Sequence, residues 1–433
     1  MGATCAPPTN SPPWSPSRQQ EGGMEEATRT KTPPPTSTPM LEAPPPPSKN
    51  AGMTATLLPY TTTSERPTNT LQINLFPEAE DCPGHYELGK FMLPKAQLID
   101  DEKWDTRKFH LWYMEAAKAG MTGFTVKILS ELFHLPGADI QLPVDFQDMY
   151  NLLREEDLDI VQITLFSLLT ITISNKRHHP ILYLSPMHIA ERVIKGFQIT
   201  DPELTVRQRE KKYEENMKEE KKKLSRYIFE VMKKLNPDGP HCIMAAYHFG
   251  NDLAGGHWVA FLVYPQDGRA VIFDSLQVPN KKGYKAIEDC LKNAYSAYLK
   301  DPQCWDRRTE KFKKRHKHHL KIRCDFPCAK QPLGSKACGL YTCENLRESK
   351  EYTNSWKKLK EAVKNRGETM KNERQAFKQI KADICKFILE KCVLQGEPFF
   401  DNEGELAVRP EFEKLSRWDT MLRPTDYTHA VEL

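Results

Sequence analysis

Gln331-Pro-Leu-Gly-Ser-Lys-Ala-Cys338-Gly339-Leu-Tyr-Thr-Cys-Glu-Asn-Leu346 places a cysteine between a turn rich in Pro, Gly and Ser and a segment with helical spacing. A thiol attacks a carbonyl only as its thiolate, and the amino terminus of a helix favours negative charge. The stretch therefore predicts Cys338 as a nucleophile. Taken alone, a cysteine here is more often a buried structural residue, so the prediction depends on its partners.

Two candidate partners lie upstream, at the ends of neighbouring apolar runs. His257 opens the run Trp258–Tyr264, and Asp274 follows the run Arg269–Phe273. The intervening Asp267-Gly268 is a hairpin signal, and antiparallel partners lie about 5 Å apart, so the two side chains are expected close together. A histidine so placed can act as the base and protonate the leaving amine, while the carboxylate fixes its tautomer. The alternative for Asp274 is a simple turn cap.

Gln331 is the fourth candidate at this site. Its side-chain N–H, together with the backbone N–H of Cys338, would form an oxyanion hole. Pro332, Gly334 and Ser335 lie between the two and are suited to the turn that this arrangement requires.

The organisation of the 433-residue chain predicts one protease domain with flanks. Residues 1–75 are rich in Pro, Ser and Thr and cannot bury a core, which predicts a disordered arm. A helical extension is expected over 84–140, the catalytic domain over 140–350, and a charged helical tail over 351–433. The predicted class is α+β, with helices followed by a mixed sheet.

Apolar periodicity predicts the individual elements. The expected strands are Ile243–Phe249, Trp258–Tyr264, Arg269–Phe273 and Lys321–Phe326, with a short strand or loop at Tyr183–Pro186. The expected helices are Phe109–Lys118, Lys127–Phe133, a core-forming stretch over Phe146–Ile173, a charged helix Arg207–Arg226 that continues to Leu235, and Tyr284–Leu299.

Four of these segments resemble one protease family in order and spacing. They resemble the ubiquitin-like-protein-specific (SUMO-type) cysteine proteases, and most of all the variants found in plant genomes within transposon-derived genes. The motifs that carry the resemblance are Gly-His257-Trp258, Phe-Asp274-Ser275-Leu276, Gln331-Pro-x-Gly and Cys338-Gly-x-Tyr-x-Cys343.

This resemblance implies a papain-like fold with a mixed central sheet flanked by helices. It implies His257 as base, Asp274 as orienting acid, Cys338 as nucleophile and Gln331 as oxyanion donor, with Trp258 as a wall over the Gly-Gly tail of the substrate. The implied activity is hydrolysis of the peptide or isopeptide bond after the tail of a ubiquitin-like protein, without a cofactor, by a monomer. A catalytically inactive, transposon-derived relic that binds such a protein or serves as a nuclear binding module is the alternative.

A zinc site is the competing interpretation of one His- and Cys-rich tract. Its candidate ligands are His316, His318, His319, Cys324 and Cys328, but no second pair with finger-like spacing follows, so no metal is expected.

Composition limits the remaining function classes. The net charge of +4 does not by itself indicate nucleic-acid binding. The basic tract Lys311–Lys321 could serve as a localisation signal, a nucleic-acid patch or a surface for an acidic protein, so nucleic-acid binding stays open. Eleven cysteines without a secretory signal favour free thiols in a reducing compartment. The longest apolar run, Ile163–Ile173, is shorter than the roughly 20 residues of a membrane helix. A nuclear or nucleocytoplasmic protein is expected.

Overall fold

The computed structural model describes residues 82–94, 97–98, 105–179, 181–196, 199, 201, 203–235, 241–250, 256–278, 283–306, 319–349, 358–361 and 372–418. These residues belong to one compact unit, Leu71–Leu433. The predicted disordered arm, most of the basic tract and the end of the predicted tail lie outside the described residues.

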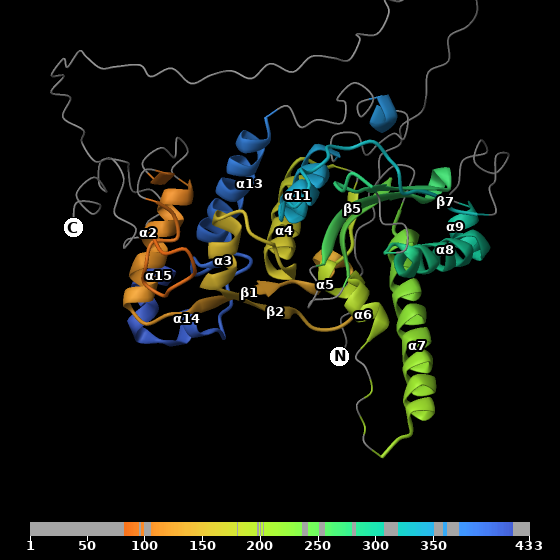
Figure 1. The fold of residues 1–433 in the computed structure, drawn as a ribbon, viewed down its shortest axis with the longest axis horizontal. Coiled ribbons are helices and arrows are strands. Elements are labelled where there is room, and N and C mark those ends of the chain that lie inside the picture. The colour runs from red at the N-terminus through yellow and green to blue at the C-terminus, as the bar shows by residue number, and fades with distance from the viewer. Residues whose placement is uncertain are drawn as a thin grey trace, which may run out of the picture. The chain divides into compact units, whose positions relative to one another are not determined.

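A mixed five-stranded sheet forms the centre of this unit, with strand order β3-β4-β5-β6-β7 (Figure 1). The middle strands β4, β5 and β6 are antiparallel neighbours, whereas β3 and β7 run parallel to the strands beside them. The bounds are β3 Ile181–Tyr183, β4 Cys242–Phe249, β5 His257–Tyr264, β6 Arg269–Phe273 and β7 Lys321–Arg323. These positions confirm the predicted strands, although β7 ends earlier than expected.

The connection between β5 and β6 explains their register. The 3-10 turn η2, Pro265–Asp267, ends at Gly268, whose φ of 59° is left-handed and therefore suits glycine. Tyr264 pairs with Arg269 across the turn, and Ala260 pairs with Phe273 farther along the strands. The hairpin thus brings the start of β5 and the end of β6 to the same end of the sheet.

Helices cover both faces of the sheet (Figure 1). Every residue of β5 is buried, as expected of a strand packed on both sides. Alternate residues enter different cores: Trp258 and Ala260 join one with α4 (Ile160–Lys176) and α11 (Cys338–Ser349), whereas Val259 and Phe261 join another with α7 (Val206–Lys233) and α8 (Lys285–Lys300). This arrangement confirms the predicted α+β fold with a mixed sheet flanked by helices.

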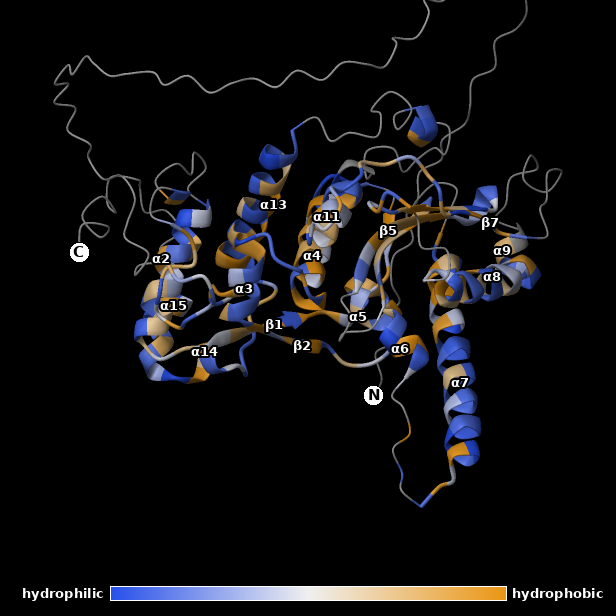
Figure 2. Cartoon of the chain, viewed as in Figure 1, coloured by the Kyte–Doolittle hydropathy of each residue, from blue (hydrophilic) through white to orange (hydrophobic). Residues whose placement is uncertain are grey.

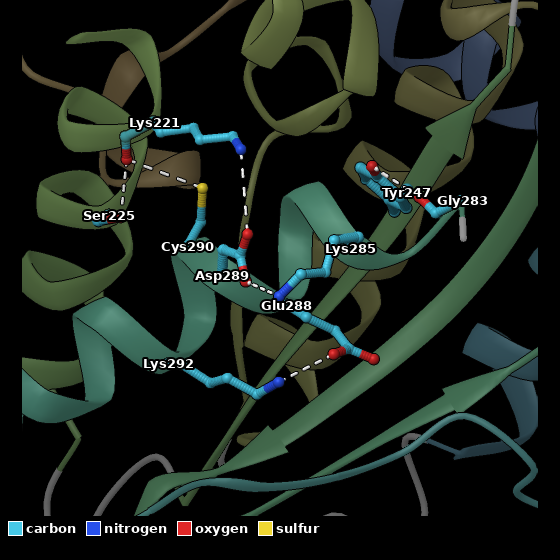
Figure 3. Close-up of polar contacts among 9 residues, drawn as sticks. All are labelled: Lys221, Ser225, Tyr247, Gly283, Lys285, Glu288, Asp289, Cys290 and Lys292. Atoms are coloured by element: carbon cyan, nitrogen blue, oxygen red, sulfur yellow. Dashed lines mark hydrogen bonds and ion pairs between the residues drawn. The ribbon is translucent and has the colours of Figure 1, made fainter. Parts of the chain in front are cut away.

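The charged helix α7 is one continuous helix, as predicted, and begins at a capping box on Thr205. Its buried residues all lie from Leu224 onward, and Figure 2 shows the preceding half as mostly hydrophilic. Figure 3 shows its contact with α8: the Cys290 thiol donates to the Lys221 carbonyl at 3.7 Å, and the Lys221 ammonium lies 3.9 Å from the Asp289 carboxylate.

The segment before the sheet contains a strand pair that the sequence analysis missed. β1 (Gly123–Ile128) and β2 (Ile140–Asp145) form an antiparallel hairpin, and only the 3-10 helix η1 (Ser130–Phe133) follows β1. The predicted helix Lys127–Phe133 is therefore wrong. Phe124, Val126 and Ile128 are buried in alternation, and this period of two outweighs the apolar spacing that indicated a helix.

The amino-terminal and carboxy-terminal flanks pack together. α13 (Glu373–Phe387) is helical as predicted, but its apolar face is buried against α2 (Asp105–Lys118) and α11. The Trp112 indole donates to the Leu415 carbonyl at 3.2 Å. The other elements are α3 Phe146–Leu153, α5 Pro186–Ile189, α6 Glu191–Lys195, α9 Pro302–Asp306, η4 Ile388–Cys392, α14 Glu405–Val408, η5 Pro410–Phe412 and α15 Glu413–Ser416. Among the described residues, no helix has the length and apolar character to span a membrane.

Candidate active site

His257 and Asp274 meet at the end of the β5–β6 hairpin. Nε2 of His257 lies 2.7 Å from Oδ1 of Asp274, and both residues are buried. Since Nε2 faces the carboxylate, Nδ1 is the ring nitrogen that remains for Cys338, whose sulfur also hydrogen-bonds the imidazole. The edge of the Phe249 ring packs against the imidazole, with 5.4 Å between centroids. The imidazole is therefore held from three directions.

The electrostatics of this pair favour charge on both partners. Burial alone would raise the pKa of Asp274, but hydrogen bonds from His257 and Tyr284 outweigh it, so the pKa of Asp274 lies below its ordinary value. Burial alone would lower the pKa of His257, but its contacts with Asp274 and Cys338 raise that pKa to about 9. An imidazolium is thus the favoured form near neutral pH.

Cys338 is the first residue of α11, as predicted, and is 5% exposed. The first amides of a helix have no partner within the helix, so its backbone N–H remains available to a developing oxyanion. Gly339 allows this helix end to lie close to the α3–α4 loop: a Cβ there would lie 2.8 Å from Cβ of Leu158.

Gln331 is fixed by both ends of its side-chain amide. Its Oε1 accepts from the Ser275 hydroxyl at 2.6 Å, and its Nε2 donates to the Ser335 carbonyl at 2.8 Å. An amide nitrogen has two donors, so one N–H is left for an oxyanion. The Gln331 backbone N–H also donates to the Ser275 carbonyl at 2.8 Å, which anchors the turn before Cys338 beside Asp274.

Trp258 lies directly after the histidine, but its indole is 2% exposed. Its N–H donates to the Leu158 carbonyl at 2.8 Å. Leu158 therefore lies against both Trp258, the residue after His257, and Gly339, the residue after Cys338. The described conformation gives Trp258 a packing role between β5 and the α3–α4 loop. Its contact with a substrate tail stays a prediction.

Three residues that contact Asp274 were not assigned to this site from the sequence. The Tyr284 hydroxyl donates to Oδ2 of Asp274, the carboxylate oxygen that His257 does not use. The Cys328 thiol and the Lys330 ammonium donate to the Asp274 carbonyl at 3.1 Å and 2.8 Å. Tyr284 directly precedes α8, ten residues after Asp274, and no local signal in the sequence indicates its role.

The zinc interpretation gains no support from the residues that the structure describes. Cys324 donates to Glu288 and Cys328 donates to Asp274, so the two thiols have different partners. Within the described ranges, no three His, Cys, Asp or Glu side chains are grouped as metal ligands. His316 and His318 lie outside those ranges.

Residues 199–388 match the model of the Ulp1 protease family, C-terminal catalytic domain. This match confirms the resemblance of that part of the chain to SUMO-type proteases. Its association with plant transposons stays a prediction. A search of curated proteins finds no match.

Several solved structures are similar to the chain. The SUMO protease Ulp1 with its catalytic cysteine oxidised to a sulfenic acid shares 13% identity at a TM-score of 0.36, covering 65% of this chain and 94% of that one. The C-terminal Ulp1 protease domain in complex with Smt3, the yeast ortholog of SUMO, shares 12% at 0.34, covering 66% and 94%. The Xanthomonas campestris effector XopD bound to ubiquitin shares 11% at 0.28, covering 53% and 91%. Because these values are low, the fold assignment rests on the family match and the sheet topology.

Proposed function

We propose that the protein is a cysteine-type peptidase that hydrolyses the peptide or isopeptide bond after the carboxy-terminal tail of a ubiquitin-like protein. The observation that carries this proposal is the buried 2.7 Å contact between His257 and Asp274. Cys338, the first residue of α11, hydrogen-bonds the same imidazole. The Ulp1-family match supports the peptidase class. The motifs around the site support a ubiquitin-like substrate.

The first half of the reaction forms an acyl-enzyme. The Cys338 thiolate attacks the carbonyl carbon after the tail, and the resulting oxyanion accepts hydrogen bonds from the Gln331 side chain and the Cys338 amide. As the carbonyl re-forms, the C–N bond breaks, and the leaving amine takes the proton from Nδ1 of His257. The products of this step are a free amine and a thioester on Cys338.

The second half releases the tail. Neutral His257 accepts a proton from water as the water oxygen attacks the thioester carbonyl. Collapse of this intermediate breaks the C–S bond, frees the tail as a carboxylic acid that loses its proton to solvent, and restores the ion pair of thiolate and imidazolium. Asp274 stays ionised throughout and keeps the ring oriented, because Tyr284 and the Leu276 amide also donate to its carboxylate.

The test is cleavage of a panel of ubiquitin-like precursors that carry a carboxy-terminal extension, followed by gel electrophoresis. Cys338→Ala should abolish cleavage of any precursor that the unmodified chain accepts, while its thermal unfolding stays unchanged. Cys343→Ala is the matched control, because Cys343 lies on the same helix but is fully buried in the core. Cleavage that persists in Cys338→Ala would end the proposal.

A further inference from the structure

A second site lies on β7, at the end of β6 remote from Asp274. A cavity of about 670 Å³ lies between the start of β6, the strand β7, the helix α8 and segment 358–361. This volume is within the range of about 300–1,000 Å³ that ligand sites occupy. The proposed peptidase chemistry uses none of its lining residues.

The lining of this cavity is cationic. Arg269, Lys321, Arg323 and Lys360 contribute four positive groups, against the carboxylates of Glu288 and Asp325. Both carboxylates are already engaged. Glu288 lies 2.9 Å from the ammonium of Lys292 (Figure 3) and accepts from the Cys324 thiol at 3.0 Å, while Asp325 lies 3.1 Å from Arg323.

Two of these cationic side chains are accessible to a ligand. Lys321 and Lys360 are exposed, and neither pairs with a carboxylate among the residues that the structure describes. They come from different elements, the last strand of the sheet and segment 358–361, yet they line the same cavity. An anionic ligand is therefore favoured.

The backbone of β7 adds a second kind of recognition. β7 is the last strand in the sheet order, and within the described residues it pairs with β6 alone. The Lys321 amide donates to the Gly268 carbonyl, so the amide and carbonyl of the next residue, Ile322, face away from β6. An exposed edge of this kind accepts an extended peptide as an added strand.

We propose that this edge binds an extended acidic segment of a partner protein as a strand beside β7, with its carboxylates on Lys321 and Lys360. Among the described residues, the lining contains no aromatic side chain on which bases could stack. This feature favours a peptide over a nucleic acid. The site is independent of peptidase activity, because it shares no residue with the proposed active site.

The binding experiment uses the full chain and a fluorescein-labelled peptide of alternating Glu and Val, whose carboxylates all lie on one face of a strand. Fluorescence anisotropy gives its affinity. A peptide of alternating Lys and Val and an oligothymidylate serve as ligand controls. The variant Lys321→Glu with Lys360→Glu is compared with Lys212→Glu and Lys218→Glu, which make the same charge change on exposed positions of α7.

The acidic peptide should bind the unmodified chain and the α7 variant equally, and the cavity variant about tenfold or more weakly, because two attractive charge pairs become repulsive. The Lys-Val peptide should not bind. Equal weakening in both variants, or no binding to the unmodified chain, would overturn the proposal. Stronger binding of the oligothymidylate, lost with the same two lysines, would also overturn it and assign the edge to nucleic acid.

Discussion

The charge of Asp274 sustains the imidazolium of His257, and Asp274→Asn removes that charge while keeping the side-chain shape. His257 is buried, which opposes its protonation, and the hydrogen bond to Asp274 is the first contribution that raises its pKa to about 9. With an amide in its place, burial is opposed only by the contact with Cys338. The pKa of His257 should then fall to its ordinary value of about 6.5 or below.

The size of the effect follows from these two values. Near pH 7.5, a group with a pKa of about 9 is roughly 97% protonated, whereas one with a pKa of about 6.5 is roughly 10% protonated. Because the imidazolium stabilises the thiolate of Cys338, the reactive ion pair should decrease about tenfold in Asp274→Asn.

The assay is alkylation of Cys338 by iodoacetamide between about pH 5 and 10, followed by peptide mass spectrometry. This reagent needs neither the oxyanion hole nor a substrate, so the rate reports the thiolate alone. Asp289→Asn is the control, because this half-buried carboxylate of α8 pairs with Lys285 and Lys221 and makes no contact with the site, and it should match the unmodified chain. An unchanged rate and pH profile in Asp274→Asn would refute the electrostatic role of Asp274.

Four further predictions concern stability and positioning. The raised pKa of His257 contributes stability that is complete below about pH 6.5 and is lost as the pH rises through about 9. Urea unfolding should show a loss of about 3 kcal/mol over this range, and His257→Gln should not show it. A flat stability profile in the unmodified chain would contradict this prediction. Burial lowers the pKa of His110 to about 4, and both ring nitrogens lack hydrogen-bond partners among the described residues, so the fold holds this ring neutral. Stability should fall by about 3 kcal/mol as the pH drops from about 6.5 to 4, and His110→Phe should lose this dependence in the same titration. Gly339→Ala should cost about 1–3 kcal/mol of unfolding free energy, because its Cβ would lie 2.8 Å from Cβ of Leu158 and 3.0 Å from its Cγ and Cδ1. Leu158→Ala removes Cγ and Cδ1 and should therefore recover part of that loss, whereas purely additive effects in a double-mutant cycle would contradict the clash. Tyr284→Phe removes a hydrogen-bond donor that favours the ionised Asp274 carboxylate, so the acid limb of the pH profile for Cys338 alkylation should move to higher pH. If that limb does not move, Tyr284 has only a packing role.

The hairpin and the positions of His257, Asp274 and Cys338 were predictable because their signals are local. The segments Trp258–Tyr264 and Ala270–Phe273 are apolar throughout, and Asp267-Gly268 between them fixes the turn. Once the hairpin is fixed, His257 and Asp274 must lie at the same end. The helical spacing after Cys338 likewise predicts where α11 begins, as the structure confirms.

Other features depend on contacts between distant segments. α13 reads as a charged tail, yet Phe377 and Ile380 are buried against elements far away in the chain. Tyr284 reads as the start of a helix, and nothing near it in the sequence shows that its hydroxyl reaches Asp274. The β1–β2 hairpin was missed because Lys127–Phe133 fits two periods, and only pairing with Ile140–Asp145 decides between them.

The central claim is that Cys338 is the nucleophile of a peptidase for ubiquitin-like proteins. The most direct measurement is to incubate the folded chain with a panel of ubiquitin-like proteins that carry an electrophile at the carboxy terminus, and to locate any adduct by mass spectrometry. We predict an adduct with at least one modifier, attached to Cys338, absent in Cys338→Ala and retained in Cys343→Ala. An adduct that persists in Cys338→Ala, or no adduct with any modifier, would contradict the claim.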